Sequence, residues 1–445
     1  KHMGNRHAWY AYYAGYEPIS IVIIQLVFPL LFEGMNRHDQ SMPYLISALA
    51  VSCQTLFFIA FGSLADFAKV KEQMLISCTV IGSVSVIVSG LLTLVNDIHV
   101  KRILISLLFI TLQIAFGLCS ICYNAILPIL KRKKTASIED EKEEERMMND
   151  ISLRGMVSGY LASLMMLTIA AGIMYRFDTL KYPLTMGIAG SCWLIVGLAS
   201  ISLMKTPAGP AIVGNPVWFS LKTTCTTFRH LNKRAGLYLL AYFFFSDGYS
   251  TIGLVAVLFA RTEMGLAEWQ IVWSVFVLLM ACIIGTGLFV LVKRMPILAS
   301  CSTINMMISL LILVSAVPLY GLVGLISDLP VGFKRSWEAF MIAAYYGFLI
   351  GACNSYARVG FAELIPRGKE AEYFSLFAVT DKGSSILGPL LFWILGVLKV
   401  EKRWGLIGLL LFLLAPIPLL FKLNRTVNPN SVVLDDAPQV IVQKD

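Results

Sequence analysis

Two carboxylic acids lie inside long apolar segments of the sequence, where an ionisable side chain is costly. Glu17 is followed by Pro18 and Asp247 by Gly248, residue types that loosen a helix. An acid at bilayer depth is unfavourable unless it lines water, pairs or takes up a proton, so both acids are candidate functional groups. At about 1.5 Å per residue, Asp247 would lie roughly 15 Å deep and Glu17 roughly 10 Å. Facing each other across a cavity, they could bind an ammonium group or carry a proton. The alternative is that they cap or pack a helix.

The two acids occupy equivalent positions of an internal repeat. Residues 11–22 and 241–252 share Ala, Tyr and Ser at the same places when they are offset by 230 residues, and this offset aligns the acids. The spacing from Gly117 to Asn124 recurs from Gly347 to Asn354. Parallel repeats of this kind are typical of transporters, in which the first helix of each half borders a central cavity. The sequence therefore predicts a duplicated unit with a site between the halves.

A second group of charges lies in the segment Thr-Asp-Lys-Gly-Ser-Ser that begins at residue 380. Neighbouring residues on a helix point about 100° apart, so Asp381 and Lys382 should not share one partner. We expect Asp381 to pair with Arg154 of another helix, which leaves Lys382 to bind the anionic group of a ligand. The alternative is a structural network that locks the two halves together.

Polar and aromatic residues near these charges complete a candidate site for a small solute that carries both charges. Asn124 and Asn354 give each half a donor and an acceptor near the cytosolic mouth, or else a plain hydrogen bond between helices. A solute with a carboxylate, an ammonium group and an apolar part needs a cation for the first, an acid for the second and an apolar wall for the third. Lys382 is the candidate for the carboxylate, and Asp247 with Glu17 for the ammonium. The aromatic residues Tyr16, Phe244 and Tyr249 are the candidates for the apolar wall.

The composition identifies the elements that must position these residues as membrane helices. The chain has 57% hydrophobic and 14% charged residues and a mean hydropathy of +0.75, which excludes a soluble domain. Apolar runs long enough to cross a bilayer predict twelve spans, six per repeat. They lie at residues 10–31, 43–64, 74–95, 103–126, 153–174, 183–204, 236–260, 270–292, 297–319, 338–360, 373–398 and 405–421.

The distribution of basic residues predicts that both termini are cytosolic. With that orientation the cytosolic side holds 24 of the 36 Lys and Arg residues, including Arg154 and Arg358 at the cytosolic ends of their spans. The opposite face holds 11, and Lys382 lies inside a span. The net charge of +9 then reflects topology and contact with anionic lipid, not nucleic-acid binding. The predicted domains are an N-terminal half at 1–204, a cytosolic linker with an amphipathic helix at 205–234, a C-terminal half at 235–422 and a cytosolic tail at 423–445. The charge-segregated run at 131–150 predicts a solvated, mobile loop that connects two spans, with binding of acidic lipid or a regulator as the alternative.

Residues 62–74 resemble the signature loop of the major facilitator superfamily. In that loop a Gly permits close helix contact, and an acid such as Asp66 caps a neighbouring helix or pairs with a basic residue. Cations such as Lys71 hold the cytosolic gate. Phe67 and Lys69 stand where the superfamily has Arg and Gly, so the gate chemistry is only partly kept. The alternative is a positively charged loop with an incidental Asp.

Several motifs together resemble one branch of that superfamily, the autophagy-related vacuolar amino-acid effluxer family (autophagy-related protein 22-like). The resemblance runs from the first span to the eleventh and is weaker in the loop at residues 62–74 and in the connector between the fourth and fifth spans. The motifs that carry it are Glu17-Pro18, residues 123–128, residues 152–155 with Gly159-Tyr160, residues 243–252, residues 363–374 and residues 380–385.

The resemblance implies a transporter of the vacuole (lysosome) membrane that exports neutral amino acids such as leucine, isoleucine and tyrosine to the cytosol after autophagic proteolysis. We expect an all-α protein with twelve transmembrane helices in two pseudo-symmetric halves, working as a monomer by alternating access. Its expected partners are amino acids, protons and membrane lipids.

The sequence contains no hydrolase or redox motif, and its five His residues are scattered, so we expect no enzyme activity, cofactor or metal. A membrane-embedded amino-acid sensor and a facilitator of another small solute remain alternatives. A lipid scramblase would need a polar groove on the outermost helices, but the third, sixth, ninth and twelfth spans carry no charge in their interiors.

Overall fold

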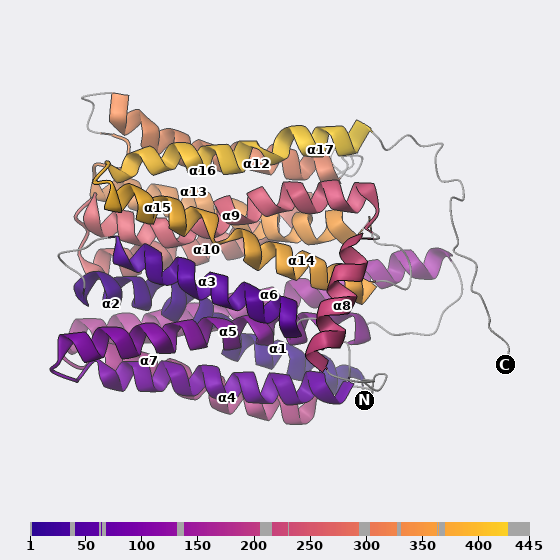
Figure 1. Ribbon diagram of the computed structural model, residues 1–445, viewed down its shortest axis with the longest axis horizontal. Helices are drawn as coiled ribbons and strands as arrows, with labels where there is room; N and C mark the ends of the chain where they lie inside the picture. Colours follow the sequence, from indigo (N-terminus) through magenta and orange to yellow (C-terminus); the bar gives the residue numbers. More distant parts are fainter. Residues whose placement is uncertain are drawn as a thin grey trace.

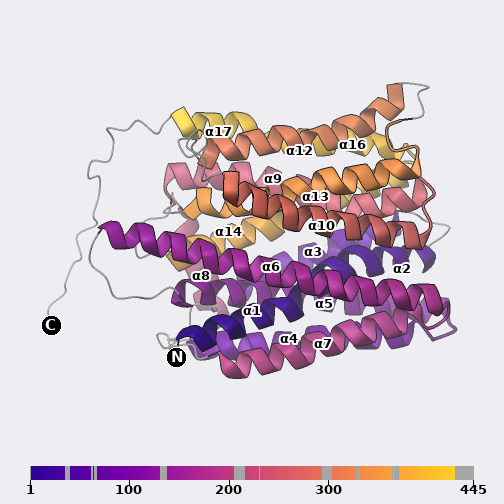
Figure 2. The same ribbon diagram turned by 180° about the vertical axis from the view of Figure 1, so that it is seen from behind.

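The protein is a bundle of long helices. A computed structural model describes residues 2–35, 41–61, 64, 68–130, 138–204, 216–229, 231–292, 303–326, 331–362, 364 and 370–425. No strand occurs among these residues. Figures 1 and 2 show most of the helices running side by side along one direction, with α8 crossing the end of the bundle at which the N-terminus lies.

Each half of the sequence supplies one set of helices, joined by α8 (Pro216–Arg229). The N-terminal set is α1 (His2–Pro18), the π-helix η1 (Ile19–Val27), α2 (Phe28–Met35), α3 (Met42–Phe61), α4 (Ala68–Leu92), α5 (Ile98–Leu130), α6 (Ile138–Arg176) and α7 (Lys181–Leu203). The C-terminal set is α9 (Lys233–Thr262), α10 (Glu268–Val292), α12 (Thr303–Ile326), α13 (Ser336–Ala362), α14 (Glu370–Ser384), α15 (Leu387–Val397), η3 (Lys402–Trp404), α16 (Gly405–Leu414) and α17 (Pro416–Arg425).

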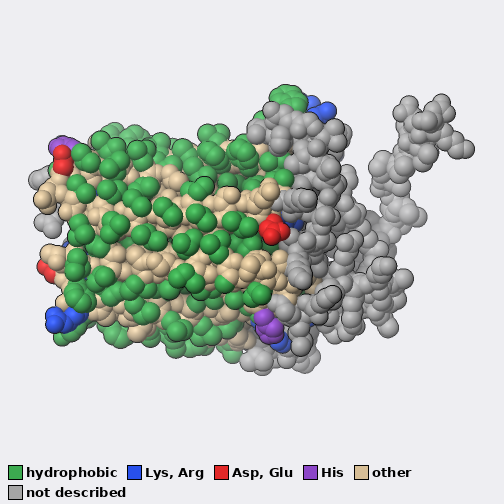
Figure 3. Space-filling model, turned by 90° about the horizontal axis from the view of Figure 1, so that it is seen from below, with side chains coloured by type: hydrophobic (Ala, Val, Ile, Leu, Met, Phe, Trp, Pro, Cys, Tyr) green, Lys and Arg blue, Asp and Glu red, His purple; other side chains and the backbone are tan. Residues whose placement is uncertain are grey.

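The helices have the length and composition of membrane spans. Ten of the described segments are long and apolar enough to cross a bilayer. The two other expected spans correspond to α13 and to the pair α14 and α15. Asn354 and Arg358 lower the hydropathy of α13, and the interruption between α14 and α15 leaves helices of 15 and 11 residues, each too short to cross a bilayer alone. Asn354, Arg358, Asp381 and Lys382 line an internal cavity. Figure 3 shows hydrophobic side chains covering one face of the bundle along its length, as expected for a surface in contact with lipid.

Pro18 and Gly248 have different effects on their helices. After Pro18, which has no N–H to donate, the first segment continues as a π-helix from Ile19 to Val27. Such π-helical turns are frequent at functional sites. By contrast, α9 passes through Gly248 without interruption, so the expected loosening at this position is wrong. A Cβ there would lie 3.0 Å from Cδ2 of Leu413, so the glycine permits close packing of α9 against α16.

The acidic run at residues 139–145 is helical and not a loop. It forms the first turns of α6, which projects beyond the bundle in Figure 2. Glu and Lys are strong helix formers, and acidic residues near a helix N-terminus are favoured by the helix dipole. The expectation of a wholly irregular connector is therefore wrong for this part. The basic residues 131–134 and the tail at 426–445 lie outside the described residues.

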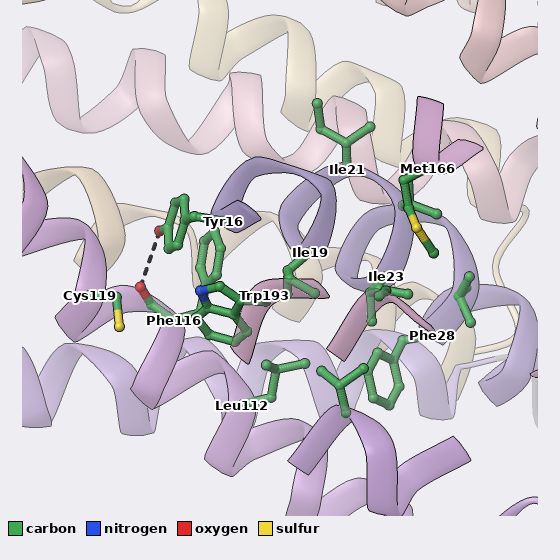
Figure 4. Packing of buried hydrophobic residues seen from close by; sticks show 14 of the residues in the cluster. Tyr16, Ile19, Ile21, Ile23, Phe28, Leu112, Phe116, Cys119, Met166 and Trp193 are labelled. Carbon is green, nitrogen blue, oxygen red and sulfur yellow. Dashed lines mark hydrogen bonds between the residues drawn. The ribbon is translucent and has the colours of Figure 1, made fainter. Parts of the chain in front are cut away.

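Apolar packing holds each half together. In the N-terminal half, the ring of Tyr16 stacks on Phe116 with centroids 4.0 Å apart, and Trp193 meets both rings edge-on (Figure 4). Ile19 and Ile23 of the π-helix are fully buried in the same core. A second core lies in the C-terminal half. Each first helix is thereby fixed against its own half while its other face borders the partner half.

The two halves meet tightly at the end of the bundle opposite α8. Two ion pairs cross between them: Arg261 Nε lies 3.5 Å from Glu33 Oε2, and Lys181 Nζ lies 2.7 Å from Glu268 Oε2. At the same end, a Cβ at Gly396 of α15 would lie 2.5 Å from Cβ of Ser41 at the start of α3. This end of the bundle is therefore closed.

Candidate substrate-binding site

A cavity of about 860 Å3 lies between the two halves. This volume falls within the range of small-molecule sites. Helices α1, α3, α5, α6, α9, α10, α13 and α14 all contribute to its wall. The charged residues that line it in the described part of the chain are Glu17, Lys71, Arg358, Asp381 and Lys382.

Asp381 is bound by residues of its own half. Its Oδ1 accepts hydrogen bonds of 2.7 Å from the hydroxyls of Tyr242 and Ser246 on α9. Its Oδ2 lies 3.2 Å from Lys382 Nζ. The expected pair of Asp381 with Arg154 is wrong, because Arg154 is an exposed residue of α6 and the described ion-pair partner of Asp381 is Lys382. The long Lys side chain can curl back toward its neighbour although their Cα–Cβ bonds diverge.

Glu17 faces this cluster from the N-terminal half. It lines the cavity together with Tyr13, one turn earlier on α1, and is close enough to Arg358 and Lys382 for a favourable electrostatic interaction. Gly159 of α6 makes this arrangement compact, because a Cβ at that position would lie 2.9 Å from Cβ of Glu17. The cavity therefore has an acid on one half opposite two cations on the other.

Asp247 does not face Glu17, and its predicted place in the substrate site is wrong. Its exposed fraction is 0%, and it is absent from the cavity wall. Its Oδ1 instead accepts a 3.0 Å hydrogen bond from the backbone N–H of Gly388 in the first turn of α15. The helix-capping alternative considered for this acid therefore describes it better.

Arg358 is the cavity residue that the sequence analysis missed. It lies on α13, lines the cavity and is close enough to the carboxylate of Asp381 for a favourable electrostatic interaction. Within the described part of the chain its guanidinium makes no hydrogen bond or ion pair. The available signal was its spacing of four residues from Asn354, which places both side chains on one face of a helix.

Two of the three predicted aromatic residues line the cavity. The Tyr16 hydroxyl donates a 3.1 Å hydrogen bond to the carbonyl of Phe116, which fixes the ring at the wall. Tyr249 receives a 2.8 Å hydrogen bond from Asn354. Phe244 does not line the cavity and packs edge-on against Phe243, so its assignment to the apolar wall is wrong.

The remaining predicted residues have mixed positions. Asn124 and Asn354 both line the cavity, and Asn124 donates to Ser120 on its own helix. Lys71 is buried and also lies at the cavity wall, near the α8 end. Asp66 lies outside the described residues.

The arrangement can bind a small molecule that carries both charges. Arg358 presents a planar set of donors that matches a carboxylate, and Lys382 adds a positive charge beside it. Glu17 can accept hydrogen bonds from an ammonium group on the opposite side. Apolar residues such as Ile21 and Phe116 form much of the remaining wall.

Comparison with known proteins identifies the family. The family model described as "Vacuole effluxer Atg22 like" matches residues 30–428. Autophagy-related protein 22 of Yarrowia lipolytica is 28% identical over 464 aligned positions, which cover 88% of this chain and 77% of that protein. Autophagy-related protein 22 of Saccharomyces cerevisiae is 24% identical, with 94% of this chain and 91% of that protein covered.

Solved structures with the same fold are transporters. The nucleoside transporter NupG matches with a TM-score of 0.62 at 12% identity, covering 96% of this chain and all (100%) of the other. A structure described as giving insight into substrate recognition in proton dependent oligopeptide transporters matches with a TM-score of 0.60 at 13% identity, covering 95% and 99%. These likenesses establish the major facilitator fold, as the sequence predicted. With the family model matching most of its length, the chain belongs to the Atg22-like family of vacuole effluxers.

Proposed function

We propose that this vacuolar membrane transporter exports neutral amino acids, such as leucine, isoleucine and tyrosine, from the vacuole lumen to the cytosol by alternating access. The observation that carries the proposal is the charge arrangement of the cavity. Glu17 from one half faces Arg358 and Lys382 from the other, and the surrounding wall is largely apolar. A zwitterion with an apolar side chain complements that arrangement in charge and in polarity.

In the proposed complex each substrate group has its own partners. The carboxylate binds the guanidinium of Arg358, with Lys382 as a second cation in the same cavity, and the ammonium binds Glu17. The bound substrate would then bridge the two halves. Binding could thereby favour the rocking motion that exposes the site to the other side of the membrane.

We further propose that both termini and α8 face the cytosol, where the basic segments contact anionic lipid. One chain contains both halves, and we propose that it works as a monomer. The closed end with its two ion pairs then faces the lumen. A protease-cleavable tag at residue 445 should be removed only from the cytosolic side of intact vacuoles; cleavage only from the lumenal side would reverse this assignment.

Uptake into proteoliposomes tests the proposed activity. Purified protein should take up labelled leucine, isoleucine and tyrosine faster than empty vesicles do, and should take up labelled nucleosides or dipeptides no faster than they do. A protein that binds leucine without any flux would be a sensor, and one that moves only the other solutes would be a facilitator of a different class. Either result would contradict the proposal.

A further inference from the structure

Asp247 lies in a polar site of the C-terminal half that is separate from the cavity. The acid is fully buried, and its Oδ1 is satisfied by the N–H of Gly388. Its Oδ2 has no hydrogen-bond partner among the described residues, and the same is true of Oγ1 of Thr251. Thr251 is four residues further along α9, so both side chains lie on one face of the helix. Two buried oxygen atoms thus share an unexplained site.

On the described helices that pack against α9 around Asp247, no cation is available to stabilise a charged carboxylate. Helices α15 and α16, which pack on this side of α9, consist of uncharged residues. On the cavity side, Lys382 is paired with Asp381, and Arg358 faces the cavity. The basic residues of α17 are in its last turn, at the far end of α9. An ionised acid in this apolar setting would be strongly unfavourable.

A proton on Oδ2 removes the unpaired charge that an ionised carboxylate would keep at this buried position. Oγ1 of Thr251, on the same face of α9, can donate to or accept from either form of the acid. A metal ion fits the site less well. Within the described residues there is no cluster of metal-binding side chains, and such an ion requires several oxygen ligands. The packing is also tight, since a Cβ at Gly388 would lie 1.7 Å from Oγ1 of Thr251.

Helix α9 connects this site to the cavity. Ser246, directly before Asp247, donates 2.7 Å and 3.0 Å hydrogen bonds to the carboxylate and the carbonyl of Asp381. Ser250 lies 2.9 Å from Ser385, where α14 ends. Helix α9 therefore holds the interruption between α14 and α15 at two places. Ser246 and Ser250 bind it on the cavity side, and Asp247 binds it on the buried side. A ligand that displaces Lys382 acts on the same interruption.

We propose that Asp247 is the proton-carrying group of this transporter, holding its proton in the present conformation and releasing it to solvent when α15 moves away from α9. The bond that breaks is O–H of the acid, and the products are a carboxylate and a solvated proton. Glu17, its counterpart in the repeat, serves the substrate. This inference rests on the proposed transport function only where it concerns coupling to flux.

The first test needs no substrate. The melting temperatures of the purified wild-type protein and of Asp247→Asn are measured between about pH 5 and pH 8. Because the folded protein holds this proton and the unfolded chain releases it, the wild type should lose stability as the pH rises. Asn cannot ionise, so Asp247→Asn should gain steadily relative to the wild type. The control Asp178→Asn, at a fully exposed side chain (100%), should keep a constant difference from the wild type. A constant difference for Asp247→Asn would overturn the proposal.

A second variant keeps the proposal testable if Asp247→Asn does not fold. Thr251→Val is close in shape and replaces the polar oxygen on the same helix face as Asp247 with a methyl group. The infrared band of a protonated carboxylic acid should be present in the wild type at neutral pH and should shift in Thr251→Val. Absence of any such band, or a band that Thr251→Val leaves unchanged, would contradict a proton on Asp247.

Transport measurements then test the coupling. Asp247→Asn should keep exchange of leucine across the vesicle membrane and lose the acceleration of uptake by a pH gradient. An unchanged response to the gradient would refute the coupling. Failure of the wild type to move any amino acid would refute the proposed function instead, and would leave the melting and infrared results to decide whether the proton site exists.

Discussion

At the scale of single residues, a shift of one position along a helix decides whether a side chain borders the cavity or is buried away from it. Tyr13 and Glu17 border the cavity from α1, and Tyr242 and Ser246 border it from α9. These pairs correspond at an offset of 229 residues, whereas the similarity of the sequences gives 230. One residue turns a helix by about 100°. Asp247 is therefore rotated out of the cavity although it aligns with Glu17 in the sequence.

Arg358 gives the sharpest prediction at this scale. Arg358→Gln should weaken leucine binding roughly 10- to 100-fold, because hydrogen bonds to a charged group contribute about 1.5–3 kcal/mol. Isothermal titration on purified protein measures this effect. Arg358→Lys should recover only part of the affinity, since an ammonium cannot reproduce the planar set of donors.

The matched control is Arg335→Gln, at an exposed residue just before the same helix. This variant should bind as the wild type does. Equal affinities of Arg358→Gln and Arg335→Gln for leucine would exclude the guanidinium of Arg358 from the site.

At the scale of elements, the irregular segments lie beside the polar groups. The π-helix begins directly after Pro18, next to Glu17, and the interruption between α14 and α15 follows Asp381 and Lys382 within a few residues. Pro18 indicated the first irregularity from the sequence. Gly383 and the pair Gly388-Pro389 mark the second as well, because Pro389 has no N–H to donate to the carbonyl of Ser385, four residues earlier. The hydrogen bonds between α9 and residues 381–388 that hold this interruption depend on packing that the sequence pattern does not contain.

Close contact of α10 with α13 gives a prediction for an element. A Cβ at Gly285 would lie 2.1 Å from the backbone oxygen of Phe348, which cannot move aside as a flexible side chain could. Gly285→Ala should therefore destabilise the protein by about 1–3 kcal/mol, as overpacking does. Its melting temperature should fall well below that of Gly287→Ala, where nothing lies within 4 Å. Equal melting temperatures would show that the two helices are not packed this closely.

At the scale of the whole molecule, the fold was more predictable than the site. Apolar length and the repeat predict spans and two halves, because lipid imposes the same requirement on every crossing segment. Which side of a helix borders the cavity depends on the packing between helices. Asp247 and Phe244 were for that reason assigned to the wrong side. Arg358 was missed because it lies near the end of an apolar run, where it was counted with the cytosolic charges.

The whole molecule is closed at one end and carries its cavity between the halves. The pairs Glu33 with Arg261 and Lys181 with Glu268 both join the N-terminal half to the C-terminal half at the closed end. In an alternating-access cycle these contacts would have to separate when the site opens to that side. The central claim is that the cavity they close recognises both charges of an amino acid.

Competition with analogues that each lack one charge tests this claim most directly. Displacement of labelled leucine from the purified protein is measured with leucine, with isocaproic acid, which lacks the ammonium, and with isoamylamine, which lacks the carboxylate. The account predicts that each analogue competes roughly 10- to 100-fold more weakly than leucine, because each leaves a charged group of the site unpaired. Glu17→Gln should reduce the difference in competition between leucine and isocaproic acid but not that between leucine and isoamylamine. Arg358→Gln should reduce only the difference between leucine and isoamylamine. Analogues that compete as well as leucine would contradict the account. Differences between leucine and the analogues that neither variant changes would also contradict it.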